Sequence, residues 1–172
     1  MDTVKPSMFR GAAGRSAVAS LAVLLLTSVH HAYGAFIYRT PWRLHMVGVA
    51  AVTAAVLLGT LAVLRARRGG WGAFALFALT TLAVPVGMIG VFEGFYNHVL
   101  KNIFYFGGAS GALLQQLFPP PTYELPNDFF FELTGVLQVV PAVLAFRALL
   151  HAFREWRQGG EQRVGSSVPE VP

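Results

Sequence analysis

The chain has 172 residues, of which 55% are hydrophobic and 12% are charged. Soluble domains carry about 25% charged residues, so this composition indicates an integral membrane protein. The absence of cysteine excludes disulfides, thiolate metal sites, iron–sulfur clusters and a cysteine nucleophile. The 13 Lys and Arg residues stand mostly at the ends of apolar runs, which is typical of helix anchors and does not indicate nucleic-acid binding.

The first predicted span covers residues 16–38 and follows a short basic tail at residues 1–15. A cleaved signal peptide is the alternative interpretation, with Ala32-Tyr33-Gly34 as the cleavage site. The apolar pattern continues beyond this site, which favours an uncleaved membrane span.

The second predicted span covers residues 41–64. Its interior consists almost entirely of Ala, Val, Leu and Gly. Ala51, Ala55 and Gly59 are spaced four residues apart and form a stripe of small side chains, which allows close contact between helices.

The third predicted span covers residues 71–100, and its helical pattern continues to about Phe106 before Gly107-Gly108 ends it. We expect Pro85 to kink this helix because proline cannot donate the backbone hydrogen bond. A second stripe of small side chains follows the same span, at Ala83, Gly87, Gly90 and Gly94.

Residues 107–126 form the longest connection, and we expect a short helix at residues 109–118 within it. This segment is apolar and aromatic, so it is predicted to pack onto the bundle as a lid.

The fourth span covers residues 127–150, with Asn127 as its N-cap and Pro141 interrupting its middle. Residues 158–172 are expected to be a disordered cytoplasmic tail. The sequence therefore predicts an all-α, four-helix transmembrane bundle with an outward-facing lid.

Basic residues predict the orientation of this bundle. Ten Lys and Arg residues fall in the two termini and the second loop, against Arg39, Arg43 and Lys101 on the other side. By the positive-inside rule both termini are cytoplasmic, which indicates a multi-pass protein of the inner (plasma) membrane.

This orientation places four of the five histidines and four of the eight acids in the outer third of the bundle. In an α-helix, His98 lies about 140° from Glu93, so both face one point only if the helix distorts, which Gly94 would permit. Adjacent His30 and His31 lie about 100° apart, so at most one points squarely inward.

A mixed set of imidazoles and carboxylates from several spans suits zinc, iron, manganese or copper. The predicted metal ligands are His31, His45, Glu93, His98 and Glu132. A haem held between two histidines of different spans stays open, with His31, His45 and His98 as the histidines available for it.

Other interpretations of the same polar cluster stay open. The charged side chains could satisfy each other as a structural network, because Arg39, Arg43 and Lys101 lie at the same depth as the acids. The cluster could also bind an organic ligand, lipid or quinone. The broad functional expectation is a non-enzymatic membrane component or complex subunit, whose expected partner is a second copy of the chain or another membrane subunit. The alternatives are a metal- or haem-binding protein, with an enzyme included, and a transporter of protons or small solutes.

Overall fold

The computed structural model describes residues 11–66, 70–120 and 123–165, with side chains described as far as residue 158. Within these ranges all regular structure is helical and no strand occurs. Four helical segments are long and apolar enough to cross a membrane: Ala12–Ile37, Pro41–Arg65, Trp71–Phe106 and Phe129–Gln158. The predicted all-α fold with four membrane-spanning helices is therefore confirmed.

The first and second spans are α1 and η1–α2, the third is α3–η2–α4, and the fourth is α6–α7, with α5 in the connection before it. Their bounds are α1 (Ala12–Ile37), η1 (Pro41–Leu44), α2 (His45–Arg65), α3 (Trp71–Thr81), η2 (Leu82–Leu100), α4 (Lys101–Phe106), α5 (Gly111–Leu117), α6 (Phe129–Leu137) and α7 (Val139–Gly165). Residues 1–10 of the expected basic tail and residues 166–172 of the expected C-terminal tail lie outside the described residues. Residues up to Gly165 continue α7.

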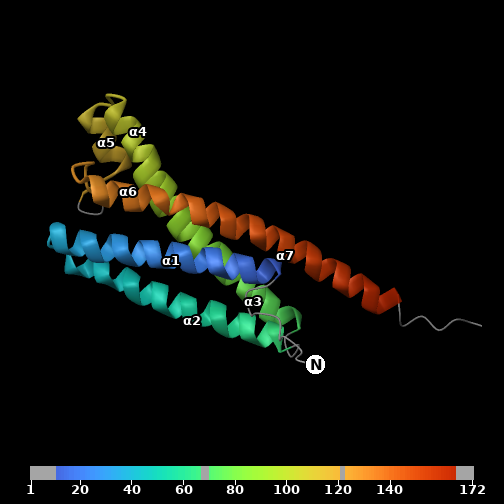
Figure 1. The fold of residues 1–172 in the computed structure, drawn as a ribbon. Coiled ribbons are helices and arrows are strands. Elements are labelled where there is room, and N and C mark those ends of the chain that lie inside the picture. Colours follow the sequence, from blue (N-terminus) through green and yellow to red (C-terminus); the bar gives the residue numbers. More distant parts are fainter. Residues whose placement is uncertain (1–10, 67–69, 121–122, 166–172) are drawn as a thin grey trace, which may run out of the picture.

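Helix α1 is the centre of the bundle and packs against α2, α6, α7 and η2. Figure 1 shows α2 running alongside α1, while the chain from α3 to α4 crosses behind it and α6–α7 lies on its other flank. At the end where α1 stops, the start of α2 and α4 lie far apart, with α1 and α6 between them (Figure 1). Large apolar side chains such as Leu25, Leu79 and Phe129 are more than 60% exposed, as expected for helices that face lipid.

The two stripes of small residues have different surroundings. On η2, a Cβ added to Gly90 would collide with the Cβ of Ala142, and one added to Gly94 would lie 3.0 Å from Val139. This stripe therefore allows η2 and α7 to pack closely, which is how membrane helices associate. The α2 stripe of Ala51, Ala55 and Gly59 is exposed on the bundle surface.

A proline interrupts each of the two helices that carry the acidic side chains of the site. Pro85 has no N–H for the carbonyl of Thr81, and from Leu82 onward the helix widens to π-helical hydrogen bonding through Leu100. Pro141 likewise leaves the carbonyl of Leu137 without its helical donor, and α6 ends at that residue. Both interruptions were predicted. The N-cap of α6 is Asp128, whose Oδ1 accepts a hydrogen bond from the Phe131 amide at 2.8 Å, so the prediction of Asn127 was wrong by one residue.

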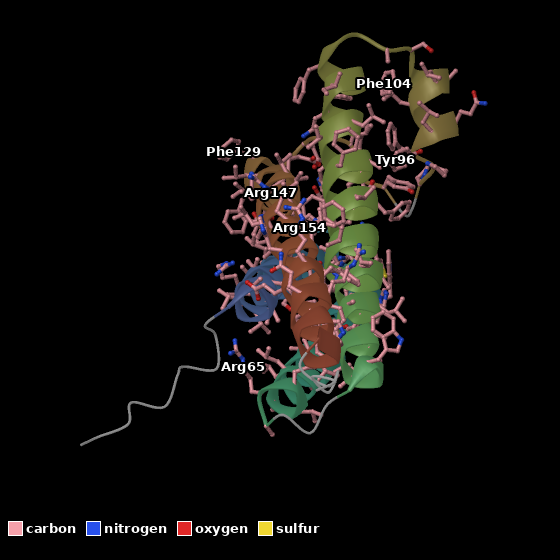
Figure 2. The ribbon with its side chains drawn as sticks, turned by 90° about the vertical axis from the view of Figure 1, so that its right-hand side faces the viewer. Arg65, Tyr96, Phe104, Phe129, Arg147 and Arg154 are labelled. Carbon is pink, nitrogen blue, oxygen red and sulfur yellow. The ribbon has the colours of Figure 1, made fainter. Side chains whose placement is uncertain are left out.

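The connection between α4 and α6 contains α5 and folds back onto the bundle. The Tyr96 hydroxyl donates to the Leu117 carbonyl at 2.7 Å, and the Tyr96 ring contacts Phe118. Arg43 Nη2 pairs with Glu124 Oε1 at 3.0 Å. Figure 2 shows Tyr96 and Phe104 at this end of the molecule and Arg65 at the opposite end. We call this end, where α1 stops and α6 begins, the lid end.

Candidate metal centre

Three buried side chains converge between α1 and η2 near the lid end. They are His30, Glu93 and His98, and one ligating atom from each lies within 4.8 Å of the other two. The Nε2 atoms of His30 and His98 are 3.2 Å apart, and His30 Nε2 is 3.5 Å from Glu93 Oε1. A tetrahedral ion with bonds of about 2.0–2.1 Å holds its ligands about 3.3–3.4 Å apart. The two separations fall on either side of that value, so the group could hold a metal ion.

The wide helix explains how Glu93 and His98 meet. These residues are five apart, and in an α-helix they would point about 140° away from each other. In a π-helix the hydrogen bonds join residues five apart, so residues at this spacing stack on one face. A helix distortion therefore does bring Glu93 and His98 together, and it extends through the whole of η2, from Leu82 to Leu100, rather than being confined to Gly94.

The hydrogen-bond partners of His30 and His98 indicate which ring nitrogen carries the proton. His98 Nδ1 lies 2.8 Å from Glu132 Oε2, and because a carboxylate accepts, Nδ1 carries the hydrogen. His30 Nδ1 lies 3.0 Å from Thr134 Oγ1, whose own proton goes to the Phe130 carbonyl at 2.9 Å, so His30 donates as well. In the neutral rings both Nε2 atoms then present lone pairs to each other, which only a shared cation or proton makes favourable.

Glu93 differs from the other acids in its charge partners. Glu132 pairs with Lys101 at 2.9 Å, and Glu124 pairs with Arg43. Among the described residues, the ion-pair contacts of Glu93 are with imidazoles alone, and its side chain is 10% exposed. A buried carboxylate requires a nearby positive charge, and a bound cation or a protonated histidine would supply it.

His31 contacts the same carboxylate oxygen as His30, with its Nε2 2.7 Å from Glu93 Oε1. This separation is too short for two ligands of one tetrahedral ion. The ring is not oriented for a hydrogen bond either, since neither of its nitrogens has a partner in the described part of the chain. His31 therefore lies against the carboxylate in ion-pair contact, without a well-oriented hydrogen bond from either nitrogen.

A cavity of about 240 Å³ adjoins this cluster. Imidazoles from α1, α2 and η2 line it, Tyr123 and Glu124 of the lid cover it, and Trp42 and Phe92, each about half exposed, form its edge. The cluster is therefore in contact with a space that a small ligand can enter.

The surrounding side chains fix the position of each imidazole. The Phe131 ring stacks on His30 with centroids 4.0 Å apart. Gly135 faces His98, and a Cβ there would lie within 2.5 Å of His98 Nδ1. At the end of α1, the Tyr38 hydroxyl donates a hydrogen bond to Asn127 Oδ1 at 2.6 Å, and burial raises the pKa of Tyr38 to about 12.

The five predicted ligands have different places in the structure. Glu93 and His98 belong to the converging group, and His31 contacts Glu93. Glu132 lies behind His98 and bonds its Nδ1. His45 is exposed on the cavity wall, with its Nδ1 2.6 Å from the Trp42 carbonyl. His30 belongs to the converging group but was not among the predicted ligands, because sequence alone gave no reason to prefer it over its neighbour.

No protein-family description matches this chain, and no curated protein or solved structure is significantly similar to it.

Proposed function

We propose that this protein binds a transition-metal ion within its helical bundle through His30, Glu93 and His98. The observation that carries the proposal is the convergence of two imidazoles and one carboxylate, in which His30 Nε2 lies 3.2 Å from His98 Nε2 and 3.5 Å from Glu93 Oε1, both near the ligand spacing of one ion. Each ring donates its other N–H, one to Glu132 and one to Thr134. Metal-ligating histidines are held in this way, because the outer hydrogen bond fixes the tautomer and raises the basicity of the ligand.

The geometry favours an ion over a haem. The rings of His30 and His98 are in direct contact, with centroids 4.6 Å apart, and Phe131 covers the other face of His30. A porphyrin between the two rings would have to separate helices that are closely packed. The adjoining cavity of about 240 Å³ is also below the roughly 300–1,000 Å³ of pockets that enclose drug-sized ligands.

A purely structural ion network is the competing account. It would place a proton between the two Nε2 atoms and a positive charge on the imidazole beside Glu93. This account explains the 2.7 Å contact of His31 Nε2 with Glu93 Oε1, but it supplies no reason for a cavity at the buried carboxylate. The metal account uses the cavity, because an ion must enter the site and exchange its ligands.

The proposed location is the inner (plasma) membrane, with both termini cytoplasmic and the lid end facing outward. The excess of basic residues at the end opposite the lid supports this orientation. The metal centre would then lie near the outer face of the bilayer.

The test is metal binding by chelator-treated protein in detergent, with Zn²⁺, Mn²⁺ and Cu⁺ added separately. Wild type should bind one ion per chain, and Glu93→Gln and His98→Asn should bind at least about tenfold more weakly. His151→Asn is the matched control, because His151 is exposed on α7 away from the cluster and its loss should change nothing. Equal binding by all four proteins, or no binding by folded wild type, would contradict the proposal.

A subunit role in a larger membrane assembly is the second candidate, and it is compatible with metal binding. The small-residue stripe of α2 supports it, because Ala51, Ala55 and Gly59 face outward and a Cβ on Gly59 would meet nothing within 4 Å. Helices associate through such stripes in membranes. Gly59→Leu should shift an oligomer toward monomer in detergent, whereas an unchanged mass of the protein–detergent complex would count against this interface.

A further inference from the structure

Two methionine side chains line the cavity that adjoins the proposed metal centre. The chain has four methionines, and both of those in the described ranges, Met46 and Met88, line the cavity beside the His/Glu cluster. Met46 lies in the first turn of α2 and Met88 in η2. Apart from His45 and Arg65 at its two ends, the rest of α2 consists of Ala, Val, Leu, Gly and Thr, so its one thioether stands where the helix meets the cavity.

The wide helix places Met88 in line with two of the proposed ligands. Met88, Glu93 and His98 are spaced five residues apart within η2. The same i to i+5 stacking that brings Glu93 beside His98 therefore puts a sulfur one turn before the carboxylate. In an α-helix these three side chains would diverge, and the thioether would have no relation to the site.

Thioether and imidazole together are the donor set of a soft cation. Methionine sulfur selects Cu⁺ among the biological first-row ions, whereas carboxylate and water suit Mg²⁺ and Mn²⁺. Two imidazoles outside the converging group also line the cavity: His31, whose nitrogens make no well-oriented hydrogen bond in the described part of the chain, and His45 at the exposed edge. Thioether and imidazole donors, which suit soft and borderline metal ions, therefore line the cavity between its exposed edge and the His/Glu cluster.

The charges at the site also favour a monovalent ion. Lys101 is paired with Glu132 and Arg43 with Glu124, which leaves the single negative charge of Glu93 to be balanced. In a bundle core of low dielectric, an ion of charge +1 neutralises that carboxylate, whereas an ion of charge +2 leaves an excess positive charge.

We propose that the ion is Cu⁺, and that Met46 and Met88 supply thioether ligands which select it as it passes from the cavity edge to His30, Glu93 and His98. This inference rests on the proposed metal-binding function and adds the identity of the ion and the residues that choose it.

The experiment compares wild type with the Met46→Leu/Met88→Leu double variant and with each single variant. Leucine conserves the volume of methionine, so the fold is retained while the sulfur is removed. Cu⁺ affinity is measured anaerobically by competition with a colorimetric Cu⁺ chelator, and Zn²⁺ and Mn²⁺ affinities are measured in parallel. Leu57→Met is the matched control, because Leu57 is fully buried in the apolar core and does not line the cavity.

We expect wild type to prefer Cu⁺, the double variant to bind Cu⁺ at least about tenfold more weakly, and its Zn²⁺ affinity to stay within about twofold. X-ray absorption of the Cu⁺-loaded wild type should show sulfur among the ligands, and the double variant should not. If the double variant binds Cu⁺ as tightly as wild type, the methionines merely fill core space, and the inference is overturned while the metal site stands. If folded wild type binds none of the three ions, both the inference and the proposed function fail.

Discussion

Gly135→Ala is the substitution whose effect on the proposed metal centre follows most directly from the packing of α6 against η2. The added Cβ would lie within 2.5 Å of His98 Nδ1 and closer still to two ring carbons. Ordinary contact begins at about 3.4 Å, so the ring must retreat by about 1 Å. That movement lengthens the 2.8 Å bond from His98 to Glu132 and displaces Nε2 from the ion.

The expected magnitudes separate this steric effect from helix propensity. Overpacking of a close contact costs about 1–3 kcal/mol, whereas glycine to alanine in an unobstructed helix gains about 0.5–1 kcal/mol. Gly135→Ala should therefore lower the melting temperature of the metal-free protein despite its better helix propensity. Metal affinity should fall by about 10- to 100-fold, as it does when an outer partner of a ligating histidine is lost.

Gly48→Ala is the control, because a Cβ at Gly48 meets nothing within 4 Å and this residue also lies in a membrane-spanning helix. Its melting temperature should be unchanged or slightly higher, with metal affinity unaltered. The assay is thermal unfolding in detergent combined with a metal titration of each protein. Identical stability and affinity for Gly135→Ala and Gly48→Ala would refute the packing argument and the role given to His98.

Three further predictions concern the charges around the site. Glu93→Gln should abolish tight metal binding while raising the stability of the metal-free protein by about 1 kcal/mol or more, because it removes a buried charge without a Lys or Arg partner; a loss of stability instead would support the structural network. Lys101→Met should lower the free energy of unfolding by about 3–5 kcal/mol, because the buried Glu132 carboxylate then loses its ammonium partner. The double variant Lys101→Met/Glu132→Gln should recover most of that loss, as measured by chemical unfolding. Arg43→Gln should break the ion pair with Glu124 and loosen the connection over residues 107–126. Proteolysis within these residues and metal release to a chelator should both become faster. Rates equal to those of wild type would show that the Arg43–Glu124 pair does not hold this connection in place.

Much of the fold was predictable because membrane helices leave strong signals. Apolar runs, the two interrupting prolines and the glycine pair after Phe106 gave four spans and their breaks. The cap of α6 was misplaced by one residue because Asn127 and Asp128 are both good caps, and only the local backbone decides between them.

The candidate site was predictable in composition and less so in arrangement. Depth and charge brought Glu93 and His98 into the predicted set, yet their meeting depends on a π-helical segment that no sequence pattern specifies. The choice between His30 and His31 depends on the rotation of α1 about its axis, which is set by packing against α6 and η2. Glu132 was predicted as a ligand, whereas the structure puts it one hydrogen bond behind His98. Carboxylates in either position look alike in sequence.

The metal content of the protein as purified from membranes, without added metal, tests the central claim most directly. Elemental analysis calibrated per chain should find close to one transition-metal ion in wild type and almost none in the folded His30→Asn/His98→Asn double variant. A folded wild type that contains no more metal than this double variant, and that gains none when metal is supplied, would contradict the assignment of His30, Glu93 and His98 as a metal centre.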